Sequence, residues 1–567
     1  MTPPSSRRLP PRAERAEAAG EPRGRERVEL YTRTFLTVLR SSGEVRARVL
    51  ERAHLEMGSS LHPLAESDEI DTGALLYSLQ RLPPVATRLE RVVMGQSPAA
   101  MLGGGSWVPM TAPGRRRRWW WSEEGRTLAA ALASSSDLDD LVPMLVAVQI
   151  EWNKAHRRLR RVTGDLARVG RARLGIPAED WARLEYLFGA GMAEFLAEVR
   201  RRPMDLRLRL VGGTQVGYAR ATREWWGPVG EVLTQEGLRQ RPLIFVSSNA
   251  HSLVNLLSGV ARRHQQEILA WARGSADPEL RDLVARSRSS PTEISQENLL
   301  YFAARMWFAA HPGARARRAA EERLEGIFHV EARSGTAVAA QVMALDRLSW
   351  EHLDPRLGIG AAQAAALGRA PHVILNIQYP LGLGAYHILR QVLEATDRVE
   401  GVYVLGKAAT LNADVGDVMI PDVVHDEHSV NTYWVDNCFS FGTVAPYVTS
   451  RSVLDRQRAV SVRSTFLQNR AYLDFYYRNA YTVVEMESGP YLGAVYEAGD
   501  SSRYPTGEQV DLTRPPMDVG IIHYASDTPY TQARTLGARG LRFEGMEATY
   551  AGALAIAHRV LERAEVV

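Results

Sequence analysis

The sequence is poor in cysteine, in lysine and in long apolar runs. Its one cysteine, Cys438, excludes a disulfide framework and a zinc site built from cysteines. No apolar run approaches the roughly 20 residues that a membrane-spanning helix needs, so we expect no membrane partner. Only two of the 69 basic residues are lysines, Lys154 and Lys407. A bias this strong points to genome composition rather than to function.

The totals describe an ordinary water-soluble chain. Its 567 residues are enough for two or three domains of about 150 residues each. It is 45% hydrophobic and 24% charged, and its net charge of +4 gives no general case for nucleic-acid binding. Residues 1–27 are rich in Pro, Arg and Glu and carry no apolar segment typical of a secretory signal. We expect a disordered leader over 1–27 and a cytoplasmic protein.

Apolar residues recur at helical spacing between residues 28 and 202, which predicts a mainly α-helical N-terminal domain of unknown role. Within it, MLGGGSWVPMTAPGRRRRWWWSEEG (101–125) is rich in Gly and Pro, and we predict a surface loop whose tryptophans pack on the helices. The alternative is that these basic and aromatic residues bind nucleic acid or a phosphorylated ligand. Nucleic-acid binding would depend steeply on salt, but no base-reading module supports it.

From residue 203 to residue 567 the pattern changes to strands alternating with helices. RPLIFVSSNAH (241–251) reads as a strand, a polar turn and the start of a helix. Residues 275–324 read as a helical insertion, and eight further strands follow it, for example HVILNIQYP, GVYVLG and YTVVEME. This order predicts an α/β domain with a mixed central sheet flanked by helices.

Polar residues gather where these predicted strands end, and ligands of such sheets bind at the carboxyl ends of strands. VVEMES places Glu485, Met486 and Glu487 after a strand, and HYASDTP places Ser526 and Asp527 after another. An unpaired carboxylate is costly to bury, so these acids are expected to be paired, protonated or turned toward a ligand.

Three motifs in order, GKAATL-x4-GDVMIPD, VVEMES and SDTP, resemble those of the nucleoside phosphorylase/nucleosidase superfamily of the phosphorylase-I type. Within that superfamily VVHDEH and the segment SDTP…FEG are most similar to the AMP nucleosidases. The resemblance covers 371–565 well, 241–346 weakly and 1–240 not at all. It implies a nucleoside phosphorylase-like fold and cleavage of a purine N-glycosidic bond.

The resemblance also implies roles for individual residues. Glu487 would hold the ribose hydroxyls and stabilise the cationic sugar, with Glu485 and Met486 lining the pocket. Asp527, positioned by Ser526, would be the general acid that protonates the leaving base. Phe466 would stack on the base, with Leu467 as a backbone contact.

The motifs define the residues that would bind a phosphate group less clearly. Lys407, after Gly406, departs from the family pattern and would act as a point charge for phosphate. Further candidates lie in HVEARSG and in the turn after the first strand of the α/β domain: Arg333, Ser247, Asn249 and His251.

Structural roles compete with each of these assignments. A Glu-x-Glu after a strand also suits a helix N-terminus, Asp527 also suits a turn, and Phe466 also suits a core. Lys407 also suits a salt bridge. The run HDEH (425–428) matches a segment of the relatives that binds no metal, so we expect no metal site and no cofactor.

The sequence leaves the nucleophile open. Hydrolytic relatives use a glutamate after the first strand, which is absent here, so His251 or Glu331 would take its place. Phosphorolytic relatives use an arginine where this chain has Val404, so inorganic phosphate stays a possible co-substrate.

We therefore expect AMP-nucleosidase-like hydrolysis of a purine nucleotide or nucleoside by a homo-oligomer. The alternatives are a phosphate-dependent phosphorylase, an ATP-depleting nucleosidase effector, or a catalytically degenerate nucleotide sensor.

Overall fold

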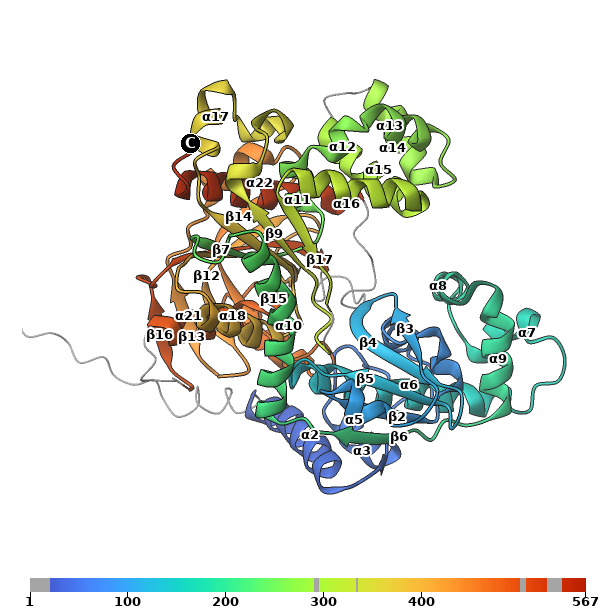
Figure 1. The fold of residues 1–567 in the computed structure, drawn as a ribbon. Helices are drawn as coiled ribbons and strands as arrows, with labels where there is room; N and C mark the ends of the chain where they lie inside the picture. The colour runs from blue at the N-terminus through green and yellow to red at the C-terminus, as the bar shows by residue number, and fades with distance from the viewer. Residues whose placement is uncertain (1–20, 290–294, 333–334, 500–505, 528–542) are drawn as a thin grey trace, which may run out of the picture.

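The computed structural model describes residues 21–289, 295–332, 335–499, 506–527 and 543–567, which form two parts (Figure 1). The N-terminal part ends with strand β6 (Arg207–Val211) and contains a small sheet. The C-terminal part contains a larger sheet, and the long helix α10 (Gln215–Gln235) joins the two. In these described ranges no helix is long and apolar enough to cross a membrane.

The large sheet is mixed, which confirms the predicted fold class. Its described strands are β7 (Leu243–Ser248), β8 (Ile327–Val330), β9 (Ala340–Ala344), β10 (Val373–Gln378), β11 (Val399–Thr410), β12 (Val418–Asp426), β13 (Thr432–Val435), β14 (Val453–Ser461), β15 (Val483–Glu485), β16 (Gln509–Leu512) and β17 (Asp518–Asp527). They run in the order β16-β13-β12-β14-β15-β11-β7-β10-β9-β8, and β17 pairs with both β11 and β12. The pairs of β7 with β10 and β11 are parallel, whereas β11 with β15 is antiparallel.

Strand β17 closes part of this sheet on itself. The pairs β11–β15, β15–β14 and β14–β12 run around one side, and β17 bridges β11 to β12 on the other. These five strands therefore form a closed ring, which leaves no exposed strand edge between them.

Helices cover both faces of the sheet (Figure 1). Phe245, Val402 and Val404 belong to one core with α18 (Gly384–Ala395) and α21 (Ser488–Gly499). Ile244 and Tyr403, one residue along each strand, belong to the opposite core with α11 (Ser252–Ser258) and α22 (Met546–Arg563). This alternation is what a strand buried on both faces requires. The other helices here are α12 (Val260–Arg263), α13 (Gln265–Arg273), α14 (Pro278–Ser289), α15 (Gln296–Ala310), α16 (Pro312–Leu324), α17 (Ala361–Leu367), α19 (Phe441–Val444) and α20 (Arg470–Arg478).

The N-terminal part is mainly helical, but its helices surround a sheet that the sequence did not predict. The helices are α2 (Glu21–Ser41), α3 (Arg48–Glu56), α4 (Thr72–Gln80), α5 (Pro98–Leu102), α6 (Ser136–Leu159), α7 (Leu166–Leu174), α8 (Ala178–Phe188) and α9 (Met192–Arg201). The sheet has the order β1-β6-β2-β5-β4-β3 and adds β1 (Val45–Arg46), β2 (Arg91–Gly95), β3 (Val108–Ala112), β4 (Arg115–Ser122) and β5 (Thr127–Ala131).

Two predictions for this part are wrong. Residues 101–125 are not a surface loop, because β3 and β4 form an antiparallel hairpin within them and Trp119 is 1% exposed. The predicted disordered leader also ends earlier, since α2 begins at Glu21.

The N-terminal core reaches into the C-terminal part at one point. Phe466 and Leu467 follow β14, yet both are 1% exposed and belong to the N-terminal core. The Phe466 ring meets Tyr77 edge-on, at 5.5 Å between centroids, and also contacts His54 and His62. This apolar anchor docks the two parts, and it leaves no face of the ring for a nucleobase.

Beneath that anchor lies a buried charged network. Glu151 accepts hydrogen bonds from Lys154 Nζ at 2.6 Å and pairs with His62 Nε2 at 2.8 Å, and all three side chains are at most 3% exposed. The backbone N–H of Asp71 donates to the second oxygen of Glu151 at 2.6 Å. A buried ion pair of this kind costs most when one partner is removed alone.

We predict that Lys154→Met destabilises the protein by about 3–5 kcal/mol, because it leaves the buried Glu151 carboxylate without its cation. Urea denaturation monitored by tryptophan fluorescence measures the change. Arg157→Ala is the control: Arg157 pairs with Asp68 on the surface, so its loss should cost less than about 1 kcal/mol. Equal costs for the two variants would contradict the importance of the buried network.

Candidate functional site

The candidate site is built around strand β11. On one edge Ala409 pairs with Val484 of β15, and on the other edge Ala409 pairs with Asp527 of β17. The segment after β15, which carries Glu487, and the end of β17 therefore flank the same stretch of one strand. Neighbouring strands lie about 4.8 Å apart, so β15 and β17 lie about 10 Å apart on either side of β11.

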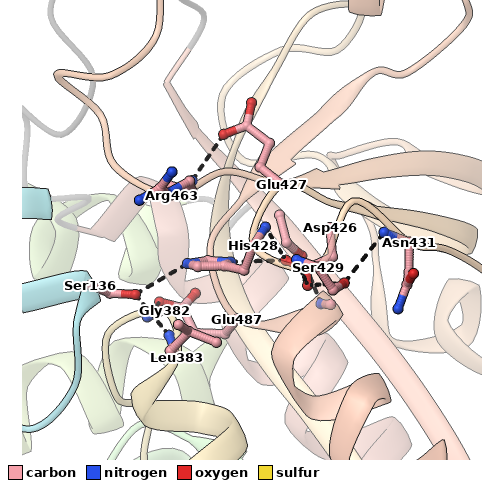
Figure 2. A network of polar contacts seen from close by, with 12 residues as sticks. Ser136, Gly382, Leu383, Asp426, Glu427, His428, Ser429, Asn431, Arg463 and Glu487 are labelled. Atoms are coloured by element: carbon pink, nitrogen blue, oxygen red, sulfur yellow. Dashed lines mark hydrogen bonds and ion pairs between the residues drawn. The ribbon is translucent and has the colours of Figure 1, made fainter. Parts of the chain in front are cut away.

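Glu487 lies where β15 turns into α21 (Figure 2). The backbone N–H of Gly382, in the turn before α18, donates to Glu487 Oε1 at 3.4 Å. Burial, and next the charge of Glu485, raise the pKa of Glu487 to about 8. The Gly382 N–H and the charge of Arg115 act in the opposite direction. Glu487 is thus protonated at neutral pH until a ligand or a cation favours its carboxylate.

Glu485 has a structural role that differs from the predicted one. Its Oε2 accepts the backbone N–H groups of Glu487 and Ser488, both at 2.7 Å, and Ser461 Oγ donates to its Oε1. These bonds satisfy the free N–H groups at the start of α21, and the carboxylate also meets the positive end of that helix. Of the two acids in VVEMES, Glu485 caps a helix, whereas Glu487 accepts a hydrogen bond from the turn before α18.

A Ser–His–Asp chain from both parts supports the turn that holds Glu487 (Figure 2). Ser136 Oγ, at the start of α6, lies 3.1 Å from His428 Nε2, and His428 Nδ1 lies 2.8 Å from Asp426 Oδ1. Leu383 N–H donates to the same Ser136 Oγ at 2.9 Å. Ser136 and both partners are buried between the two parts, so this chain positions the turn rather than presenting a nucleophile.

Gly382 is required at this contact for a steric reason. Its φ is +51°, and a Cβ added there would collide with Ser136 Oγ. No sequence motif pointed to Ser136, whereas His428 lies in the run HDEH (425–428), which has the residue types of a metal site. Among the described residues no group of three or more His, Cys, Asp or Glu side chains is arranged to hold a metal ion.

On the other side of β11, Asp527 ends β17 beside Ser526 and Lys407. Ser526 Oγ donates to Asp527 Oδ2 at 2.7 Å and lies 3.2 Å from Ala408 O. The Lys407 side chain is exposed, and partial desolvation by the surrounding protein lowers its pKa. The charge of Asp527 raises the pKa of Lys407, whereas the charges of Arg305, Arg116 and Arg81 lower it further.

Two of those cations come from the N-terminal part. Arg116 on β4 donates to Tyr379 O at 3.2 Å, and its guanidinium lies 4.7 Å from the centre of the Tyr379 ring. Arg81, just after α4, is buried, and Arg115 is close enough to Glu487 to affect its pKa. The region around Lys407 is therefore positively charged, and the predicted helical module contributes directly to it.

The remaining predicted residues lie in several places. Ser247 is fully buried and accepts from Tyr491 O–H at 2.8 Å, and Asn249 Oδ1 accepts the N–H groups of His251 and Ser252 at the start of α11. Both therefore support the fold. Gly406 lies on β11, and Met486 packs on a small core beside β15. Arg333 lies outside the described residues.

His251 stays near the site in its neutral form. Burial, with the charges of Arg305 and Arg318, lowers the pKa of His251 to about 4. Its Nδ1 lies 3.5 Å from Tyr550 O–H. The charge of Arg305 lowers the pKa of both His251 and Lys407.

The chain belongs to DUF6909, a family of unknown function, whose model matches residues 47–562. This match spans almost all of both parts described above. No match to the chain is found among the curated proteins.

Solved structures show a distant similarity to nucleosidases and nucleoside phosphorylases over part of the chain. The 5'-methylthioadenosine/S-adenosylhomocysteine nucleosidase of S. pneumoniae is 12% identical with a TM-score of 0.26, and the match covers 41% of this chain and 91% of that one. Uridine phosphorylase from Schistosoma mansoni, in complex with thymine, is 10% identical with a TM-score of 0.29, covering 59% and 91%. Since these values are low, the chemistry proposed below comes from the side chains of this chain.

We predict that Glu487→Gln stabilises the protein at pH 8 and not at pH 4.5. The carboxyl group has a raised pKa in the folded state, so the unfolded chain loses this proton between pH 4.5 and 8 while the folded chain keeps it. Wild-type stability therefore falls across this window, by at most about 4 kcal/mol. Urea denaturation at both pH values measures the difference.

Glu351→Gln, at an exposed position, is the control and should leave the pH dependence unchanged. The same free energy difference between wild type and Glu487→Gln at both pH values would contradict the raised pKa.

We also predict that Ser136→Ala costs about 1–3 kcal/mol, because it leaves the Leu383 N–H and His428 Nε2 without their buried partner. A double-mutant cycle with His428→Ala should give a coupling energy of about 0.5–3 kcal/mol. Ser41→Ala, an exposed serine, should stay within about 0.5 kcal/mol. Additive effects of Ser136→Ala and His428→Ala would show that the two parts are not coupled here.

Proposed function

We propose that this protein cleaves the N-glycosidic bond of a purine nucleotide by hydrolysis. The observation that supports the proposal is the pairing of Ala409 with both β15, the strand that precedes Glu487, and β17, the strand that ends at Asp527. Glycosidic cleavage requires two acidic groups with different roles, one for the developing cation and one for the leaving group.

Glu487 is the group for the sugar. Its carboxyl group accepts a hydrogen bond from the backbone N–H of Gly382 and has a pKa raised to about 8. Ribose hydroxyl groups donating to it would favour the carboxylate, which then stabilises the positive charge that develops on the sugar. The burial that raises the pKa also strengthens this electrostatic effect, because little solvent screens it.

Asp527 is the group for the base. Its carboxyl group is oriented by the Ser526 hydroxyl and lies in the field of Lys407. Protonated, it would donate to the purine as the bond to the sugar breaks, and the electrons of that bond go to the base. Water adds to the sugar and loses a proton, so the products are the free base and ribose phosphate.

A 5'-phosphorylated substrate such as AMP suits the positive charge around Lys407. Among the described residues, the arginines whose charges act on Lys407 come from both parts of the molecule, for example Arg305 on α15 and Arg116 on β4. A neutral nucleoside would leave this charge without a partner.

A nucleotide sensor is the second candidate, and the raised pKa of Glu487 favours it. An acid that stays protonated at neutral pH can donate a hydrogen bond to a ligand without stabilising a cation. In that case nucleotide binds and no base is released.

We predict that the wild type releases adenine from AMP without added phosphate and that Asp527→Asn lowers kcat by about 10²–10⁴-fold, the usual contribution of a general acid. Glu487→Gln should lower kcat/KM, and wild-type kcat/KM should rise with pH through about 8 as Glu487 ionises. Chromatography of base and sugar products measures each rate.

Asp397→Asn, at an exposed aspartate before β11, is the matched control and should keep full activity. Nucleotide binding with no base release by the wild type would favour the sensor, and a requirement for phosphate would replace hydrolysis by phosphorolysis.

A further inference from the structure

A hollow of about 520 Å³ lies between the β3–β4 hairpin and the C-terminal part. Its described lining comes from Pro109 to Ala112 on β3, Arg115 to Trp120 on β4, three alanines of the segment before β9, and Gln378 at the end of β10. Figure 1 shows β3 and β4 on the side of the N-terminal part that faces the large sheet. The volume is within the range of pockets that hold small ligands.

The four arginines of β4 alternate between the two faces of the hairpin. Arg115 and Arg117 point toward α6: Arg117 Nη2 lies 2.7 Å from Asp137 Oδ1, and Arg115 Nε lies 3.1 Å from Asp140 Oδ2. Arg116 and Arg118 point the other way and donate to the carbonyl oxygens of Tyr379 and Ala332. This is the alternation that a strand imposes on successive side chains.

Arg116 keeps an uncompensated charge in this arrangement. Arg116 contacts a carbonyl oxygen and an aromatic ring, and it has no carboxylate partner among the described residues. No aspartate or glutamate lies among the described residues that line the hollow. An arginine that is not paired with a carboxylate is suited to a phosphate group.

The rest of the lining is apolar and aromatic. Met110 and Trp120 are partly exposed and face the hollow together with Pro109. A flat ring can pack on such a surface while an anionic group binds the arginines. Arg116 connects this hollow to the candidate site, because its charge acts on Lys407.

We propose that the hollow between β4 and the large sheet binds the phosphate of a nucleotide, with Arg116 as its main ligand. This subsite assigns the phosphate contact of the proposed reaction to the N-terminal part. Its role for the substrate rests on the proposed function. The binding itself does not depend on turnover. A residue before the α/β domain thereby selects 5'-phosphorylated ligands over nucleosides.

The test measures binding to the full-length Asp527→Asn protein by isothermal titration calorimetry, with AMP, ribose 5-phosphate and adenosine as probes. AMP and ribose 5-phosphate should both bind, and adenosine should bind at least about 10-fold more weakly than AMP. Adding Arg116→Ala should weaken AMP binding by about 10–100-fold, the effect of losing a hydrogen bond to a charged group. Arg116→Lys should recover part of the affinity.

The matched control is Arg209→Ala, because Arg209 is an exposed arginine on β6 of the same sheet, away from the hollow. It should change AMP affinity less than about 2-fold. Unchanged AMP binding in Arg116→Ala, or equal affinities for AMP and adenosine, would overturn the subsite.

The two proposals fail in different ways. If the wild type releases no base while AMP binding still depends on Arg116, the subsite is supported and the proposed reaction is wrong. If the wild type releases base and Arg116→Ala leaves KM for AMP unchanged, the reaction is supported and the subsite is wrong.

Discussion

Strand β11 is hydrogen-bonded along both edges, and this pairing determines where the acids of the candidate site lie. Its first half pairs with β7 and its last residues pair with β15, while β17 runs along the opposite edge. A shift of one residue in either register would turn the side chains at the strand ends to the other face of the sheet. The site therefore depends on backbone pairing more than on any single side-chain contact.

The N-terminal part acts on this site through polar contacts around one apolar anchor. Phe466 docks into the N-terminal core, and around it Arg463 pairs with Asp139 at 2.9 Å and Ser136 with His428 at 3.1 Å. Interfaces within a chain that are rich in polar contacts resemble those between separate proteins. The family model includes both parts, so we regard them as one functional unit.

Much of the C-terminal sheet could be predicted from the sequence, because buried strands read as short apolar runs. HVILNIQYP became β10, GVYVLG became the centre of β11, and the acids of VVEMES do follow a strand. The β4 strand was missed because four arginines hide its alternation. Two of them are neutralised by Asp137 and Asp140, which lie on a helix about 20 residues further on, and no local pattern shows that pairing.

The roles of the site residues likewise depend on tertiary contacts that no local pattern shows. Glu485 and Glu487 are equivalent in sequence, and only the position of the α21 N-terminus decides that Glu485 caps the helix. Phe466 follows a strand end, as a base-stacking residue would, but the docked N-terminal part covers it. Ser136 and Arg116 reach the site from a part of the chain that the motif resemblance does not include.

The most direct measurement of the central claim is a crystal structure of the full-length protein with adenine and ribose 5-phosphate bound. Our account predicts the ribose hydroxyls on Glu487, the base within reach of Asp527, and the phosphate on Arg116. Ligands bound elsewhere, or a ribose that contacts neither acid, would contradict it.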